Sequence, residues 1–294
     1  MRRKCENTTN QCYHLTTEVV HGLPIFNEAE TDVLLRITRR VERFSGMKLL
    51  GYCILPDAVH LYAHLPARQE LADGEIYERV SQMNDTGKAN AFEQRWKFLS
   101  AKVASGDAEG VAALEALKRK YVVRMYDPSN FIRTLKERYT ASYNERHDEQ
   151  GTLWTGRYVW KTTAADPASV RAKLVWLDTL PYLEGVATEA ADAFRGTGFI
   201  AALAGDAAAR SGYAVAYERD AAEWEEIAAL HRQAIREHLA RIDERRRMEE
   251  GAEAVDAAQG GGAVEPIREM VREQPDEDEA REANPPSKGY QTVA

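Results

Sequence analysis

The sequence predicts an α+β fold, because segments with strand and helix periodicity follow one another in a recognisable order. The segment CYHLTTEVV (12–20) is rich in β-branched residues and predicts a strand. A helical pattern follows at 27–46, and MKLLGYCIL (47–55) and VHLYAHLP (59–66) predict two more strands. The order strand, helix, strand, strand is the opening of a split βαβ, ferredoxin-like sheet.

The first predicted helix has clear boundaries in the sequence. Asn27 is a good N-cap, and Glu30 follows it by three residues, which is the spacing of a capping box. Gly46 ends the helix, because glycine readily adopts the left-handed conformation of a helix C-terminus.

A helical insertion is predicted at residues 68–130, where the chain is charged, rich in alanine and helical in period over two or three segments. A further helix is expected at 127–147 after the turn-forming DPSN, followed by a loop and a strand at 151–163. The next helix begins at Asp166, with Pro167 in its first turn, and we expect Pro181 and Gly185 to end it.

The C-terminal part divides into an extension at 191–249 and an acidic tail at 250–294. Apolar residues between 220 and 249 recur at steps of three and four and predict a long amphipathic helix. This helix either packs on its own domain or docks a partner or a second copy. The tail is rich in glycine, proline and acids, and we expect it to be disordered.

Composition restricts the class of protein. The 294 residues contain no apolar run long enough to span a membrane, and no secretory signal is expected at the N-terminus. The three cysteines lack the spacing of a disulfide framework, which indicates reduced thiols. We therefore expect the protein in a prokaryotic cytoplasm or nucleoid. The net charge of −8 lies entirely in the last 46 residues, so it does not exclude a nucleic-acid partner for residues 1–248.

Three runs of sequence carry a resemblance to a known family. They are GYCILPDAVHLYAHLP (51–66), LKERYTASYNERHDEQGTLWTGRY (135–158) and VWLDTLPYLEG (175–185). In this order and at these separations they resemble the REP-associated tyrosine transposases, relatives of the single-tyrosine transposases among the HUH nucleases. The resemblance covers roughly residues 12–190, and we take residues 1–190 as one transposase-like HUH domain.

The resemblance implies a mechanism. In such enzymes two histidines on one strand hold a divalent cation, which polarises the scissile phosphate. A tyrosine on a nearby helix attacks the phosphate and forms a phosphotyrosine bond. Hairpin DNA lies across the sheet.

Two of the catalytic positions are degenerate in this chain. The second family histidine matches His60, but the first matches Ala58, whose methyl group binds no metal. The nucleophilic tyrosine matches Trp176, whose indole has no hydroxyl. We therefore expect no intact catalytic residue, no metal and no cofactor, with His60 as a vestige. A divalent metal belongs only to the alternative of a diverged, active nickase with a rearranged site.

Residues suited to binding nucleic acid lie between Lys118 and Lys161. This segment contains ten Lys and Arg residues and five acidic residues. Cations neutralise phosphates and aromatic faces stack bases, so this mixture suits a single strand or a hairpin. The candidate binding residues are Arg133, Lys136, Arg138, Tyr139, Tyr143, Arg146, Arg157, Tyr158, Trp160 and Lys161. A solvated helix face next to a core edge would show a similar pattern.

The sequence thus favours a transposase-derived protein that binds hairpin or single-stranded DNA or RNA and has lost strand cleavage. One rival is the diverged nickase. The other is a scaffold subunit that docks a partner protein through the helix at 220–249. No membrane partner is expected.

Overall fold

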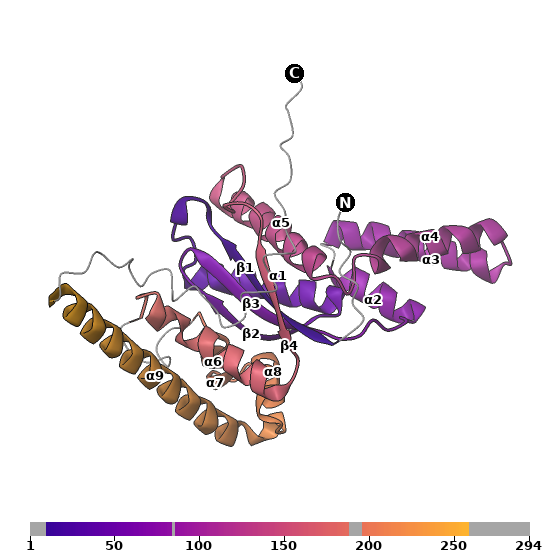
Figure 1. Cartoon of the computed structure of the whole chain (residues 1–294). Helices are drawn as coiled ribbons and strands as arrows, with labels where there is room; N and C mark the ends of the chain where they lie inside the picture. Colours follow the sequence, from indigo (N-terminus) through magenta and orange to yellow (C-terminus); the bar gives the residue numbers. More distant parts are fainter. Residues whose placement is uncertain (1–9, 84–85, 188–195, 259–294) are drawn as a thin grey trace. The chain divides into compact units, whose positions relative to one another are not determined.

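The computed structural model describes residues 10–83, 86–187 and 196–258, and the fold is α+β (Figure 1). Residues up to Arg236 form one compact unit, and those from Glu237 onward form a second, which is described by itself. The first unit contains a four-stranded antiparallel sheet with helices on both faces.

The sheet has the strand order β2-β3-β1-β4. Its members are β1 (Gln11–Glu18), β2 (Lys48–Ile54), β3 (Ala58–Leu65) and β4 (Val159–Ala164). The register pairs Thr16 with His60 across β1 and β3, and His14 with Lys161 across β1 and β4. Since side chains alternate along a strand, His14 and Thr16 share one face of the sheet with His60 and Lys161.

The opposite face of the sheet packs on α1 (Glu28–Ser45) and α5 (Pro128–His147). The predicted boundaries of α1 are confirmed: the Asn27 side chain accepts from the Glu30 amide at 3.0 Å, and Gly46 has a φ of 75°. The 3₁₀ turn Val20–Gly22 connects β1 toward α1. Leu34 of α1 and Leu135 of α5 are almost fully buried against this face.

Between β3 and α5 the described residues form three helices, as the sequence predicts for the insertion. They are α2 (Asp73–Met83), α3 (Thr86–Ala104) and α4 (Ala108–Val122). α2 packs on α1, while α3 and α4 pack against each other as a hairpin (Figure 1). Asp107 caps α4 and also forms an ion pair with Lys102 of α3, at 2.9 Å.

The second layer of helices covers the face that carries His60. It consists of α6 (Pro167–Leu183), α7 (Gly198–Leu203) and α8 (Ala207–Tyr217), of which α6 and α8 pack on β2. Asp166 caps α6 as predicted, but the expectation that Pro181 ends the helix is wrong. Pro181 lies inside the last turn, which continues to Leu183.

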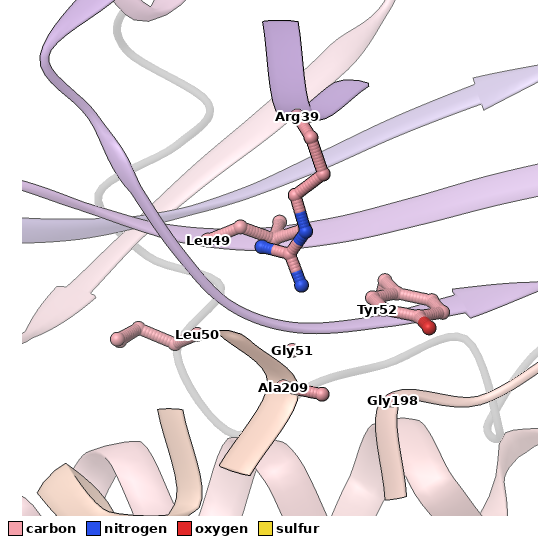
Figure 2. A pocket seen from close by; sticks show the side chains of 7 residues that line it. All are labelled: Arg39, Leu49, Leu50, Gly51, Tyr52, Gly198 and Ala209. Carbon is pink, nitrogen blue, oxygen red and sulfur yellow. The ribbon is translucent and has the colours of Figure 1, made fainter. Parts of the chain in front are cut away.

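Glycines allow this layer to approach β2 closely. Figure 2 shows the guanidinium of Arg39 pointing toward β2, with Gly198 and Ala209 on the other side of the strand. The space that these residues enclose has no room for a water molecule. A Cβ at Gly212 would lie 1.9 Å from the carbonyl oxygen of Leu50. Only glycine therefore fits at this position of α8.

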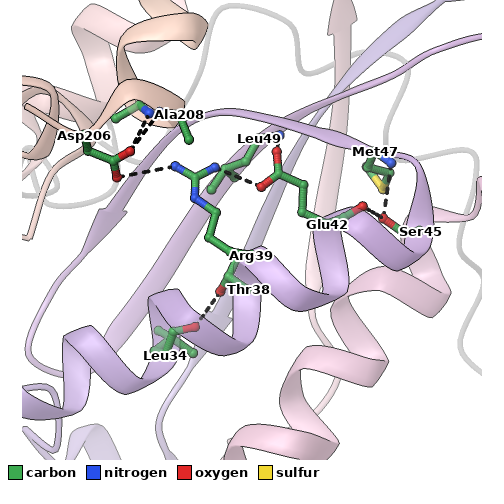
Figure 3. A network of polar contacts seen from close by, with 10 residues as sticks. Leu34, Thr38, Arg39, Glu42, Ser45, Met47, Leu49, Asp206 and Ala208 are labelled. Atoms are coloured by element: carbon green, nitrogen blue, oxygen red, sulfur yellow. Dashed lines mark hydrogen bonds and ion pairs between the residues drawn. The ribbon is translucent and has the colours of Figure 1, made fainter. Parts of the chain in front are cut away.

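Arg39 connects the two layers around the edge of β2 (Figure 3). Its guanidinium pairs with Glu42 at 2.9 Å and with Asp206, the N-cap of α8, at 3.8 Å. Glu42 also accepts from the amide of Leu49 on β2 at 2.8 Å. Because these side chains are partly exposed, we assign them a modest share of the stability.

The first turns of α9 (Trp224–Ala258) belong to the first unit. The helix follows the 3₁₀ turn Ala221–Glu223, whose capping box is formed by Asp220 and Glu223. Trp224, Ile227, His231 and Ile235 are buried. This part of the predicted amphipathic helix thus packs on its own domain.

A buried carboxylate joins these helices. Asp178 of α6 accepts hydrogen bonds from the Tyr213 hydroxyl of α8 at 2.8 Å and pairs with His231 of α9 at 2.9 Å. The other ring nitrogen of His231 lies 3.0 Å from the Tyr217 hydroxyl. Buried polar groups of this kind are stable only when they are satisfied in this way.

One expectation about the C-terminal part changes. The long helix ends at Ala258 rather than near Glu249, so residues 250–258 are helical and not part of an irregular tail. Residues 259–294 of the predicted acidic tail lie outside the described residues, as does Cys5. Cys12 and Cys53 are buried free thiols. Among the described helices, none is long and apolar enough to cross a bilayer.

The close approach of α8 to β2 gives a first prediction. Gly212→Ala should lower the free energy of unfolding by at least about 2 kcal/mol, because its methyl group has to displace the Leu50 backbone. The measurement is urea unfolding followed by circular dichroism. Gly74→Ala is the matched control in α2, where a Cβ meets nothing within 4 Å. Equal stability of the two variants would contradict the close approach.

Candidate functional site

A polar cluster lies on the sheet face that α6 covers. The Nε2 atom of His14 lies 3.2 Å from the Nδ1 atom of His60, and the Thr16 hydroxyl is 3.3 and 3.4 Å from these two nitrogens. Neighbouring strands supply the three groups, since β1 carries His14 and Thr16 while β3 carries His60. Polar side chains thus meet across two central strands of the sheet.

The two imidazoles meet nitrogen to nitrogen. Their centroids are 5.4 Å apart and their planes differ by only 17°. The distance between the centroids equals the 3.2 Å between the facing nitrogens plus about one centroid-to-nitrogen length in each ring. The two nearly parallel rings therefore lie almost in one plane. One ring donates its N–H and the other accepts, which two neutral imidazoles can do.

Trp176 of α6 lies against this histidine pair. Its ring centroid is 5.3 Å from that of His14 and 6.0 Å from that of His60, with an edge-to-face geometry in both cases. Lys173 precedes it by three residues and so shares its helix face. The Lys173 ammonium lies 4.5 Å from the Trp176 ring centroid, within the range of a cation–π interaction.

The surroundings keep both histidines neutral. Burial, together with the positive charge of Lys173, lowers the pKa of His60 to about 4. Burial also lowers the pKa of His14 well below its ordinary value, and Lys173, His60 and Lys161 add to that effect. The charges that act on the pair are therefore positive.

A cavity of about 220 Å³ adjoins the cluster at Thr16. It lies between the end of β1 and the loop that precedes β4. The lining residues are Thr16, Thr17, Glu18, Thr155, Gly156, Arg157 and Val159. Polar and charged groups predominate among them.

The residues present do not fit the divalent metal of the active-enzyme alternative. Ala58 offers only a methyl group, and the facing nitrogens of His14 and His60 are engaged with each other. Across the residues that the structure describes, no group of three His, Cys, Asp or Glu side chains could hold a metal ion.

The predicted binding residues of α5 are only in part exposed. Arg133 is about two-fifths exposed and pairs with Glu137 at 3.8 Å. Lys136 donates to the carbonyl oxygen of Gly156 at 2.7 Å and lies over the Trp154 ring. Burial lowers the pKa of Lys136. Arg138 is half-buried.

Tyr139 is not a stacking residue, and that expectation is wrong. Its side chain is fully buried, and its hydroxyl donates to Glu30 at 2.8 Å. Arg146 and His147 also bond to Glu30, so Arg146 ties α5 to α1. Although burial opposes it, the hydrogen bonds from His147, Tyr139 and Arg146 hold the pKa of Glu30 below its ordinary value. Tyr143 stacks on His147 at a centroid distance of 4.1 Å.

Trp160 and Lys161 do not line one groove, because consecutive residues of a strand face opposite ways. Trp160 is 40% exposed, and its ring contacts Tyr13 on the face of the α1–α5 layer. Lys161 lies opposite His14 in the register of β1 and β4, on the face of the polar cluster. Tyr158 is half-buried against the core, and Arg157 is an exposed wall of the cavity.

Sequence reasoning missed three members of the cluster: His14, Thr16 and Lys173. A signal for the first two was present, since they alternate along a predicted strand that a split βαβ sheet places beside the strand of His60. Lys173 gave no signal, because only the packing of α6 shows that this charge is buried.

Comparisons with known proteins give a partial likeness. No protein-family model and no curated protein matches the chain. A solved REP-associated tyrosine transposase bound to a REP hairpin matches 70% of this chain and 87% of its own, with 11% identity and a TM-score of 0.43. A structure described as a putative transposase from Deinococcus radiodurans R1 matches 63% of this chain and 97% of its own, with 14% identity and a TM-score of 0.28. Scores this low do not establish a shared fold, so function has to follow from this chain's own residues.

The lowered pKa of His60 gives a prediction on stability. Between the ordinary value of 6.5 and about 4, the unfolded chain binds more protons at this residue than the folded chain does. Stability should therefore fall as the pH falls, and His60 should account for about 2 kcal/mol between about pH 7.5 and pH 5. Urea unfolding at both pH values measures this difference.

His60→Gln serves as the reference in that experiment, because it removes the titrating ring and leaves other buried pairs such as Asp178–His231 in place. The variant should lose less stability on acidification than the wild type. An identical pH dependence in the two chains would mean that His60 is not held neutral.

Proposed function

We propose that the chain is a REP-associated tyrosine transposase relative that binds hairpin or single-stranded DNA or RNA and has lost tyrosine-dependent strand cleavage. The contact between His60 and Trp176 carries this proposal. The family resemblance pairs these positions as metal ligand and nucleophile, although they lie more than a hundred residues apart. Rings in contact at those positions are what a former active site would leave.

The strand order supports the finer description of the fold. β3 lies between β1 and β2 and is antiparallel to both, while β4 adds to the free edge of β1. A split βαβ, ferredoxin-like sheet has this arrangement, with α1 as the crossover between β1 and β2.

Other residues of the resembling runs have structural roles that favour a retained scaffold. The Trp154 indole donates to the Thr140 hydroxyl of α5 at 2.9 Å and is buried in the core. Gly185 follows α6 with a φ of 69°, a conformation that favours glycine. These positions hold the frame of a site whose reactive groups have changed.

The chemistry of the cluster supports the proposed loss of cleavage. An indole has no hydroxyl with which to form a phosphotyrosine bond. Tyr182 is six residues beyond Trp176 on α6, which turns it well away from the face that Trp176 occupies. Both observations favour binding without cleavage over the diverged nickase.

The first test is for a covalent adduct. The protein with magnesium or manganese and hairpin-flanked single-stranded DNA should give no shifted band after denaturing electrophoresis. Ala58→His with Trp176→Tyr should not restore the adduct, because Asp57 and Leu180 also stand where the resembling family has asparagine. A denaturation-resistant band from the wild type would overturn the loss of cleavage, and Tyr182→Phe would then show whether Tyr182 is the nucleophile.

The second test is the salt dependence of binding. Arg133→Ala with Lys136→Ala should flatten the log–log salt slope on a single-stranded hairpin flank by roughly 0.7 for each phosphate that these cations no longer neutralise. Fluorescence anisotropy over a salt series measures this slope. The control is Arg95→Ala with Lys97→Ala, two exposed cations on α3. If the wild type binds neither hairpin DNA nor hairpin RNA at low salt, the nucleic-acid function is wrong.

A further inference from the structure

Helices close the middle of the sheet on both faces. On one face α6 covers the histidine pair, and His14 is only 4% exposed. On the other face α1 and α5 bury Leu34 and Leu135 almost completely. A DNA duplex does not bend into such a place, because it is stiff over about 150 base pairs. The paired stem of a hairpin therefore has to bind at an outer surface of the molecule rather than across the middle of the sheet.

An arginine stripe runs along the outer side of α1. It consists of Arg36, Arg40 and Arg43, and all three residues are exposed. Steps of four and three residues keep these side chains within about 60° of one another around the helix axis. The three charges therefore point into solvent on one side of the helix layer formed by α1 and α5.

Within the described residues, Arg36 and Arg43 lack the acidic partner that their neighbour Arg39 has. Arg39 pairs with Glu42 at 2.9 Å and with Asp206 at 3.8 Å (Figure 3). No ion pair of Arg36 or Arg43 is found in the described part of the chain. Like charges three or four residues apart destabilise a helix. A bound anion would relieve this repulsion along the stripe.

Two exposed acids on the helices that pack beside α1 have partners of their own. On α2, Glu75 pairs with Arg79 at 2.7 Å, and on α5, Glu137 pairs with Arg133 at 3.8 Å. Asp32 is an exposed acid on the same side of α1, one turn before the stripe. Because salt screens exposed charges over about 10 Å, Asp32 weakens the field mainly at that end.

The helix dipole explains only one end of the stripe. Arg43 lies in the last turn of α1, where a positive charge interacts favourably with the carbonyl end of the helix. Arg36 lies in the middle of the helix, and the effect of the dipole is confined to the end turns. A phosphate ligand accounts for both positions, whereas the dipole accounts for one.

The length of the stripe suits the phosphates of a duplex strand. From Arg36 to Arg43 it runs for about 10 Å, at about 1.5 Å per residue. One strand of a duplex carries a phosphate for about every 3.4 Å of its axis, so the stripe spans about three phosphates. The planar guanidinium of arginine also donates two parallel hydrogen bonds to one phosphate.

We infer that the arginine stripe of α1 binds the paired stem of a nucleic-acid hairpin through its phosphates, without reading its bases. This assignment rests on the proposed function, because it names the surface that holds one part of the hairpin. The candidate residues on α5 are then left for the unpaired flank. One hairpin contacts both sets of residues, since α1 and α5 pack side by side.

The experiment measures the salt dependence of binding to a fluorescent stem-loop without an unpaired flank, made as DNA and as RNA. Arg36→Gln with Arg43→Gln should flatten the log–log slope on DNA by roughly 0.9 for each phosphate that is no longer neutralised. Arg36→Lys with Arg43→Lys should keep the wild-type slope, because both charges remain. The control is Arg95→Gln with Lys97→Gln, which removes two exposed charges from α3 and should leave the slope unchanged.

Thermal unfolding by circular dichroism separates binding from a structural role of the two arginines. The stem-loop should raise the melting temperature of the wild type by more than it raises that of Arg36→Gln with Arg43→Gln, because a ligand stabilises the folded chain according to its affinity. If the arginines only support α1, the variant melts earlier but the stem-loop raises both melting temperatures equally, which would overturn the assignment.

Failure of the stripe and failure of the proposed function give different results. If the wild type binds a hairpin with an unpaired flank and the glutamine variant keeps the wild-type slope on the stem-loop, the stripe does not hold the stem and the proposed function stands. Equal flattening in the α3 control would also overturn the stripe, since net charge alone would explain the change. If the wild type binds neither substrate as DNA or RNA at low salt, the proposed function is wrong and the stripe falls with it.

Discussion

The position of α6, and with it the whole polar cluster, depends on one buried carboxylate. Asp178 is 1% exposed and binds donors from α8 and α9 at once. It lies two residues from Trp176, which places the two side chains on nearly opposite flanks of the helix. Removing the carboxylate would take this acceptor from three buried donors, because the Phe199 amide of α7 also donates to it. One flank of α6 is thereby locked while the other presents Lys173 and Trp176 to the sheet.

The sequence predicts the local part of this fold well, because local signals decide it. Asn27 and Asp166 predict the starts of α1 and α6, and the period-two segments predict strands where β1, β2 and β3 lie. Contacts between elements that are far apart in the sequence could not be predicted in this way. Tyr139 looked like a surface aromatic among cations, and only the packing of α5 on α1 shows it bonded to Glu30. Lys173 looked like an ordinary helix charge for the same reason.

The polar cluster on the sheet supplies its own hydrogen-bond partners. His60 has a partner inside the sheet, because His14 on the neighbouring strand bonds to it. A buried imidazole left without any partner would have cost stability. The indole of Trp176 fills the volume above the pair and also stabilises the nearby Lys173 ammonium.

The hairpin of α3 and α4 leaves the sheet domain through α2 and meets it again only where α5 begins. Its buried side chains, such as Phe92 and Leu114, are covered mainly by the insertion itself. The entropy of closing such a connection grows only slowly with its length. Evolution can therefore lengthen, shorten or exchange this module while the strand register underneath stays the same, which makes it a natural place for lineages to acquire new attachments.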